Sequence, residues 1–243
     1  SGLFSFYQSG AIDESLSDLW GEYYDQTNFL GNDDPLVKWL IGEDVAGAGA
    51  IRKMSDPPFF GDPDKMTSPL YYTGDADYGG VHWNNGVNNK AVFLMVDSGI
   101  FNGKTVAALG WDKTAAIYYE ANTNLLSSGS DYSDLYYAVQ QACVNLTGQK
   151  GITSADCVQV KNALDAVEMN AQPVANFNPD APICPPGFSS VPIFQDNMES
   201  GQGKWILTGA WSIDNTFASS PTHMLYGDDY YLSYVSSATM ATG

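Results

Sequence analysis

The sequence has few basic residues and no long apolar run. Lys and Arg number 10 against 28 Asp and Glu, which gives a formal net charge of −18 at pH 7. A charge of this sign repels phosphate groups, so we expect neither nucleic acid nor an anionic lipid surface as a partner. No apolar run approaches the roughly 18 residues that would indicate a bilayer span, and we expect no membrane partner.

Cysteine is also scarce, with residues only at positions 143, 157 and 184. Cys143 and Cys157 lie near the ends of two consecutive predicted helices, where a disulfide would close a short loop. Cys184 would then be the odd cysteine. Such a bond would contribute about 3 kcal/mol and requires an oxidising compartment. The alternative is three reduced, buried thiols.

Several residue types are abundant instead. Apolar residues make up 44% of the chain, which is enough for a folded core, and charged residues only 16%. Many Tyr, Trp, Gly, Asn and Ser residues are typical of secreted bacterial proteins, so we expect a secreted, extracellular protein. Because the N-terminus has neither an initiator Met nor a basic region, we expect a chain that begins within a longer gene product or after processing.

Helical spacing of apolar residues predicts a helical domain over residues 1–170. The expected helices span about 10–26, 82–98, 103–126, 132–147 and 153–169. Thr153 or Ser154 is expected to cap the last of them.

The pattern changes after residue 170. Five prolines without periodicity in 171–190 predict a stiff linker. Short alternating runs in 191–243 predict a few strands, the start of a β-sandwich of the jelly-roll type. The predicted fold class is therefore mainly α, followed by a linker and a partial β-sandwich.

Carboxylates lie opposite the apolar stripe of the predicted helix 10–26. At 100° per residue, Glu14, Asp18 and Asp25 project away from the stripe. Such an acidic face is ordinarily only solvated. However, Glu14 and Asp18, one turn apart, also suit a metal ligand beside a carboxylate that orients an imidazole ligand. The spacing alone leaves both interpretations open.

The segment around these carboxylates, GAIDESLSD at positions 10–18, resembles the G-A-[IL]-[ND]-E-x-x-S-D segment of thermolysin-like zinc metalloendopeptidases. Further blocks follow in that family's order. The resemblance covers residues 1–170 and implies the family's helical C-terminal lobe, with peptide hydrolysis as the reaction. The later blocks are IGEDV (41–45), RKMSDP (52–57), GDPD (61–64), YTG (72–74) and GGVHWNNGVNNKA (79–91).

The resemblance implies a role for each matching residue. Glu14 matches the third zinc ligand, and Asp18 the carboxylate that holds a zinc-bound His in one tautomer. His82 matches the imidazole that hydrogen-bonds the oxyanion, with Asp77 as its acidic partner. Arg52 matches the guanidinium that binds a substrate carbonyl. The apolar wall of the adjacent substrate pocket is matched by Ile41, Val45 and Ile51.

A calcium site is also implied. Asp25 and Glu43 match acidic ligands of the family's main calcium site, and Asp33 or Asp34 offers a third oxygen. Leu40 stands where members with two calcium ions have an acidic residue, so the resemblance implies at most one ion. A solvated acidic loop is the alternative.

The chain departs from the family in one decisive respect. The H-E-x-x-H helix, which carries two zinc ligands and the general base, is absent, and the only histidines are His82 and His223. We therefore expect this chain alone to be inactive and to need its own N-terminal lobe as a partner for protein and peptide substrates. Ser5 stands where the family has a Tyr that shares the oxyanion, and Phe6 or Tyr7 is a candidate replacement.

The sequence thus predicts the C-terminal part of a secreted zinc metalloendopeptidase. Two other classes of protein explain the sequence less well. A non-catalytic interaction module derived from such a protease would have no reason to keep Glu14, Asp18, Asp77 and His82 together. A structural calcium-binding protein, suggested by the acidic charge, would leave the block around His82 unexplained.

Overall fold

The computed structural model of the chain describes residues 2–28, 30–43, 45, 47, 49–173, 191, 196–215, 222–227 and 237–240. The chain divides into two compact units, Ser1–Asp180 and Ala181–Gly243. Most of the predicted linker, residues 174–190 with Cys184, lies outside the described residues. Among the helices that the structure describes, none has both the length and the apolar character of a membrane span.

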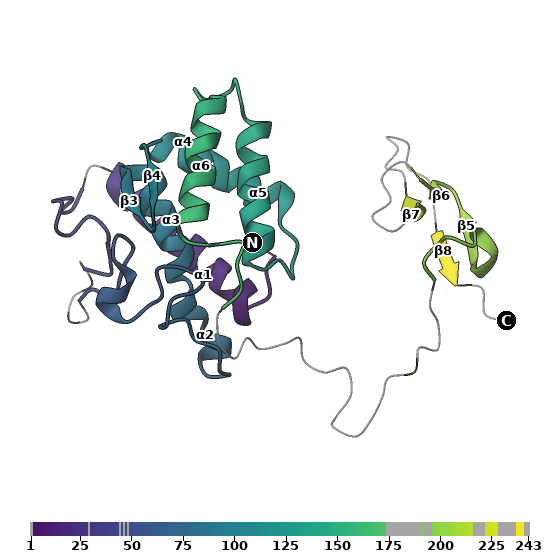
Figure 1. Ribbon diagram of the computed structural model, residues 1–243, viewed down its shortest axis with the longest axis horizontal. Coiled ribbons are helices and arrows are strands. Elements are labelled where there is room, and N and C mark those ends of the chain that lie inside the picture. The colour runs from purple at the N-terminus through teal and green to yellow at the C-terminus, as the bar shows by residue number, and fades with distance from the viewer. Residues whose placement is uncertain are drawn as a thin grey trace. The chain divides into compact units, whose positions relative to one another are not determined.

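The first unit is built mainly of helices, as predicted (Figure 1). Short pairs of strands connect some of them, β1 (Leu40–Ile41) with β2 (Arg52–Lys53) and β3 (Gly99–Phe101) with β4 (Lys104–Val106). A 3₁₀ turn, Pro57–Phe60, and a π-helical turn, Ala121–Leu125, complete the unit. The helices are α1 (Tyr7–Thr27), α2 (Asp77–Asn84), α3 (Gly86–Asp97), α4 (Trp111–Glu120), α5 (Tyr132–Asn145) and α6 (Ser154–Ala166).

The core of this unit forms where the helices meet. The apolar stripe of α1, with Ile12, Leu16 and Leu19, is buried in one continuous cluster with side chains of α3, α4, α5 and α6. Helix α1 also packs against α2 and α3, which carry His82 and Asn89 of the candidate site. The core thereby fixes the position of the carboxylates on α1.

Helices α5 and α6 lie side by side (Figure 1) and are joined by a disulfide. The Cα atoms of Cys143 and Cys157 are 5.6 Å apart, so the structure contains the bond that the sequence favoured over reduced thiols. Thr153 caps α6, as expected: its hydroxyl accepts from the amide of Asp156, whose carboxylate accepts from the amide of Thr153.

Two helix predictions were wrong in their extent. The helix expected over 103–126 begins only at Trp111, because Lys104–Val106 forms strand β4 instead. Asn102 and Gly103 have φ values of 46° and 75°, the conformation of a two-residue hairpin turn that Asn-Gly favours. The helix expected over 82–98 is divided between α2 and α3.

The second unit contains the predicted strands. β5 (Trp205–Thr208) pairs with β8 (Ser237–Met240), and β6 (Trp211–Asp214) pairs with β7 (Met224–Gly227), both antiparallel. Before β5, a 3₁₀ turn covers Gln202–Lys204. Glu199 accepts hydrogen bonds from the backbone and side chain of His223, so this histidine is half-buried within its own unit.

Candidate active site

An unusual turn positions His82. Four consecutive residues, Asp77 to Gly80, have φ values of 53°, 53°, 91° and 79°, all in the left-handed region. Gly79 and Gly80 adopt this conformation readily and leave no room for a side chain, since a Cβ on Gly79 would lie 2.2 Å from Cδ1 of Tyr7. The turn therefore depends on its two glycines.

The turn folds the Asp77 carboxylate back onto His82. Asp77 Oδ2 accepts a hydrogen bond from the His82 backbone amide at 2.8 Å, and Oδ1 lies 2.7 Å from Nδ1 of the imidazole. Asp77 thus accepts from the His82 amide and fixes the ring at the same time. The structure brings this predicted pair together.

The other edge of the imidazole faces α1. Nε2 of His82 is 3.4 Å from Oε2 of Glu14, and the two side chains are 46% and 34% exposed. The ring is therefore half open to solvent and held between two carboxylates from different segments. A protonated imidazole in this place can donate hydrogen bonds from both of its nitrogens.

Asp18, one turn further along α1, is the centre of a buried polar network. Its Oδ1 accepts from Nη2 of Arg52 at 2.6 Å, and its Oδ2 accepts from Nε of Arg52 at 2.8 Å. Nδ2 of Asn85 and Nδ2 of Asn89 also donate to Oδ2, at 2.9 and 2.8 Å. Among the described residues Oδ2 has three donors and Oδ1 one, so Oδ1 retains capacity for a further donor.

The two hydrogen bonds to Asp18 also hold Arg52 in place. Burial alone would lower the pKa of Arg52, but the hydrogen bonds and the charge of Asp18 raise it above its ordinary value. The guanidinium uses its Nε and Nη2 edge for Asp18, so its Nη1 end points away from that carboxylate. Asp18 therefore fixes the orientation of the Arg52 cation.

The predicted pocket residues lie beside Arg52. Ile41 pairs with Arg52 across β1 and β2, and the Ile51 amide donates to the Ile41 carbonyl at 2.9 Å. A Cβ placed on Gly42 would lie 3.8 Å from Cγ1 of Ile51 and 4.0 Å from Cγ2 of Val45. The side chains of Ile51 and Val45 are more than half exposed, so they offer apolar surface beside β1 and β2.

The predicted calcium ligands lie near a carboxylate that the sequence reasoning missed. Burial raises the pKa of Glu22 to about 8; the Gln26 hydrogen bond opposes this, whereas the charges of Glu43 and Asp25 add to it. Among the described residues, no three acidic, histidine or cysteine side chains gather into a metal site.

The sequence did not predict the contacts that three further residues make at the site. Asn85 and Asn89 stand at i and i+4 and donate to Asp18; within the described chain their own Oδ1 atoms have no hydrogen-bond partner. Tyr7 was considered only as a replacement oxyanion donor, but its hydroxyl donates to Asp75. The spacing of the asparagines was visible in the sequence, but their partner 67 to 71 residues away was not.

This helical fold, with its acidic, imidazole and guanidinium groups in one place, is matched by a known family. The family model described as "Thermolysin metallopeptidase, alpha-helical domain" matches residues 1–169. The chain belongs to this metallopeptidase family, and it contains the family's helical domain.

Individual relatives agree with this assignment. The chain is 39% identical over 178 residues to a zinc metalloproteinase of Renibacterium salmoninarum, covering 69% of this chain and 32% of the relative. It is 40% identical over 171 residues to a thermolysin of Alicyclobacillus acidocaldarius, covering 69% of this chain and 30% of that relative. The chain thus spans about a third of the length of these curated relatives.

A solved structure is similar as well. The precursor of protealysin, a metalloproteinase from Serratia proteamaculans, matches with a TM-score of 0.53 and 25% identity. The match covers 69% of this chain and 52% of that one.

Proposed function

We propose that this chain is the C-terminal part of a secreted zinc metalloendopeptidase that hydrolyses peptide bonds in protein and peptide substrates. The observation that carries the proposal is the position of His82 between Asp77, at 2.7 Å, and Glu14, at 3.4 Å. This arrangement places an imidazole donor beside a carboxylate suited to bind zinc. The disulfide between Cys143 and Cys157 supports export, because such bonds persist in oxidising compartments.

The zinc site fits this chain only in part. A catalytic zinc takes three protein ligands and keeps one open position. Glu14 offers one carboxylate ligand, and Oδ1 of Asp18 has capacity for the N–H of an incoming imidazole ligand. Two imidazole ligands are still needed, because this scheme assigns His82 to the oxyanion rather than to zinc. In this proposal they belong to the protein's own N-terminal lobe. Bound zinc would act as a Lewis acid that activates water for attack on a peptide carbonyl.

His82 and Arg52 act on the substrate in this scheme. His82, fixed by Asp77, donates from Nε2 to the oxyanion that develops on the scissile carbonyl. Arg52, fixed by Asp18, donates from its Nη1 end to the substrate carbonyl beyond the scissile bond. The following side chain would rest on the apolar surface of Ile41, Val45 and Ile51. An aimed oxyanion donor lowers the barrier by about 3 kcal/mol.

Calcium is not given a role in this proposal. Asp25 and Glu43 remain the predicted ligands, but the described residues supply no third acidic side chain in a metal-binding arrangement.

Zinc content and activity test the proposal. The 243-residue chain alone should show no peptidase activity and no stoichiometric zinc at micromolar free metal, because it supplies a single ligand. The complete protein should bind zinc and cleave casein. Glu14→Gln should abolish both in the complete protein, whereas His223→Ala should change neither. A complete protein with an intact upstream lobe but no zinc would instead indicate the alternative, a non-catalytic interaction or calcium-binding module.

A further inference from the structure

Tyr7 has a backbone conformation that tyrosine rarely adopts. It is the first residue of α1, and its φ is 50°, in the left-handed region. For a bulky side chain this conformation is energetically unfavourable and persists only where surrounding contacts enforce it. The contacts of Tyr7 therefore indicate what the strained conformation serves.

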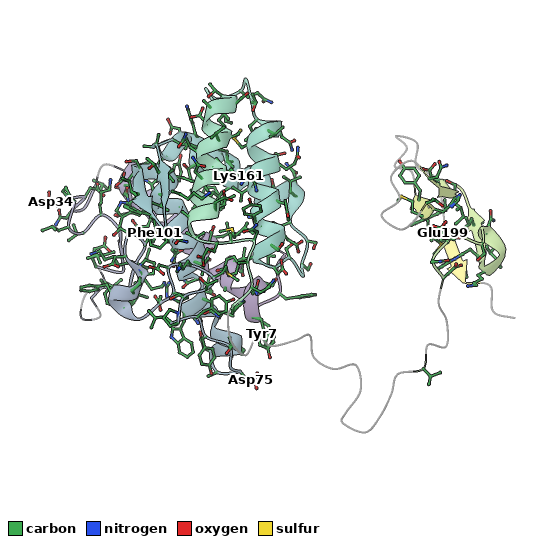
Figure 2. All side chains as sticks on the ribbon, viewed as in Figure 1. Tyr7, Asp34, Asp75, Phe101, Lys161 and Glu199 are labelled. Atoms are coloured by element: carbon green, nitrogen blue, oxygen red, sulfur yellow. A yellow bond between two sulfur atoms is a disulfide. The ribbon has the colours of Figure 1, made fainter. Side chains whose placement is uncertain are left out.

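Those contacts go to the turn that carries Asp77. The Tyr7 ring covers Gly79 so closely that a Cβ there would lie 2.2 Å from Cδ1, and the Tyr7 hydroxyl donates to Oδ1 of Asp75 at 3.2 Å (Figure 2). An aromatic pair reinforces them, because the rings of Phe6 and Tyr78 meet edge to face at 5.5 Å. Residues 6 and 7 thus contact the turn on both sides of Asp77.

We propose that Tyr7 is a positioning residue for His82: it holds the turn 75–80 so that the Asp77 carboxylate stays on the amide and imidazole of His82. The inference rests on the proposed function for its effect on catalysis, but not for its effect on the turn. Tyr7 itself touches neither substrate nor metal in this scheme. Its action passes through Gly79 and Asp75 to Asp77.

A purely structural role explains the observations less well. Tyr7 is 46% exposed, and Asp75 is exposed, so the contact adds little to the core of the unit. The hydrogen bond to Asp75 and the charge of that carboxylate raise the pKa of Tyr7, which keeps the phenol a donor through neutral and mildly alkaline pH. The strained backbone of Tyr7 thus serves the contacts with the turn rather than the packing of the core.

Hydrogen exchange in this chain tests the first step. The His82 amide donates to Asp77 and should exchange about tenfold faster in Tyr7→Ala, with a smaller increase in Tyr7→Phe and Asp75→Ala. Tyr24→Ala, at an exposed position on the same helix, is the control and should leave this exchange unchanged. If Tyr7→Ala does not fold, the two milder variants decide, since Asp75 is exposed and Phe keeps the ring.

Kinetics in the complete enzyme test the second step. Tyr7→Ala should lower kcat by about 10- to 100-fold while KM stays within about twofold, because a displaced donor affects the transition state. The effects of Tyr7→Phe and Asp75→Ala on kcat should not add in the double variant, because both changes remove the same hydrogen bond. Unchanged His82 exchange and unchanged kcat in Tyr7→Ala would overturn the inference. Inactivity of the unmodified enzyme would contradict the proposed function and leave the exchange test valid.

Discussion

The buried ion pair between Asp18 and Arg52 gives the prediction with the largest effect on stability. Their side chains are only 5% and 13% exposed, and Asp18 accepts from Asn85 and Asn89 as well. Asp18→Asn keeps the shape of the side chain but removes its charge and replaces one acceptor by a donor. Arg52 would then remain buried and charged without its hydrogen-bonded counterion, and only the charges of Asp62 and Glu14 would offset its own.

The expected loss follows from this burial. Removing one partner of a buried pair typically costs about 3–5 kcal/mol, because the remaining charge is not compensated. An exposed pair costs far less, about 0.3–0.5 kcal/mol when it lies at i and i+4 on a helix. Lys161 and Asp165 on α6 stand at i and i+4, and their side chains are 52% and 16% exposed, so Lys161→Ala, which removes the exposed partner, is the matched control (Figure 2 labels Lys161).

Urea unfolding followed by circular dichroism in the helical band measures both losses, because the helices lie in the first unit. Asp18→Asn should destabilise this unit several times more than Lys161→Ala. Replacing both partners, with Asp18→Leu and Arg52→Met, should cost much less than the sum of the two single changes. An Asp18→Asn variant that loses less than about 1 kcal/mol would refute the reasoning, since the pair would then behave as hydrated.

Two further predictions concern stability. Reducing the bond between Cys143 and Cys157, which are 14 residues apart, should lower the stability of the helical unit by about 3 kcal/mol; equal melting temperatures with and without reductant would contradict this. Burial raises the pKa of Glu22 to about 8, above its unfolded value, so its stabilising contribution is complete at acid pH and is lost as the pH rises toward 8. Glu22→Gln should therefore melt close to wild type at pH 4 and clearly above it at pH 8, and an equal difference at both values would disprove the burial argument.

Much of the fold could be predicted from the sequence because its signals are local. The capping of α6 by Thr153 and the buried stripe of α1 both follow from spacings within a few residues. The Asn102-Gly103 hairpin was equally local, and its turn signal was present but was outweighed by the apolar pattern that continues to Leu126. A helical period was assigned to residues 104–106, which in fact form a strand.

Only part of the candidate site could be predicted from the sequence. The motif pointed to Glu14, Asp77 and His82, and the structure places these three together. The bond between Asp18 and Arg52 joins residues 34 positions apart, and no spacing rule predicts it. The left-handed φ of Tyr7 could not be predicted either, because Tyr7 meets Gly79 and Asp75 only in the tertiary fold.

The kinetic effect of His82→Ala in the complete enzyme tests the central claim most directly. Because the imidazole is 46% exposed and outside the core, its removal should leave zinc content and melting temperature nearly unchanged. Loss of an oxyanion donor should lower kcat by about two to three orders of magnitude, and Asp77→Asn should reproduce part of that loss. An unchanged kcat, or a lobe that unfolds when His82 is replaced, would contradict the assignment of this histidine to the transition state.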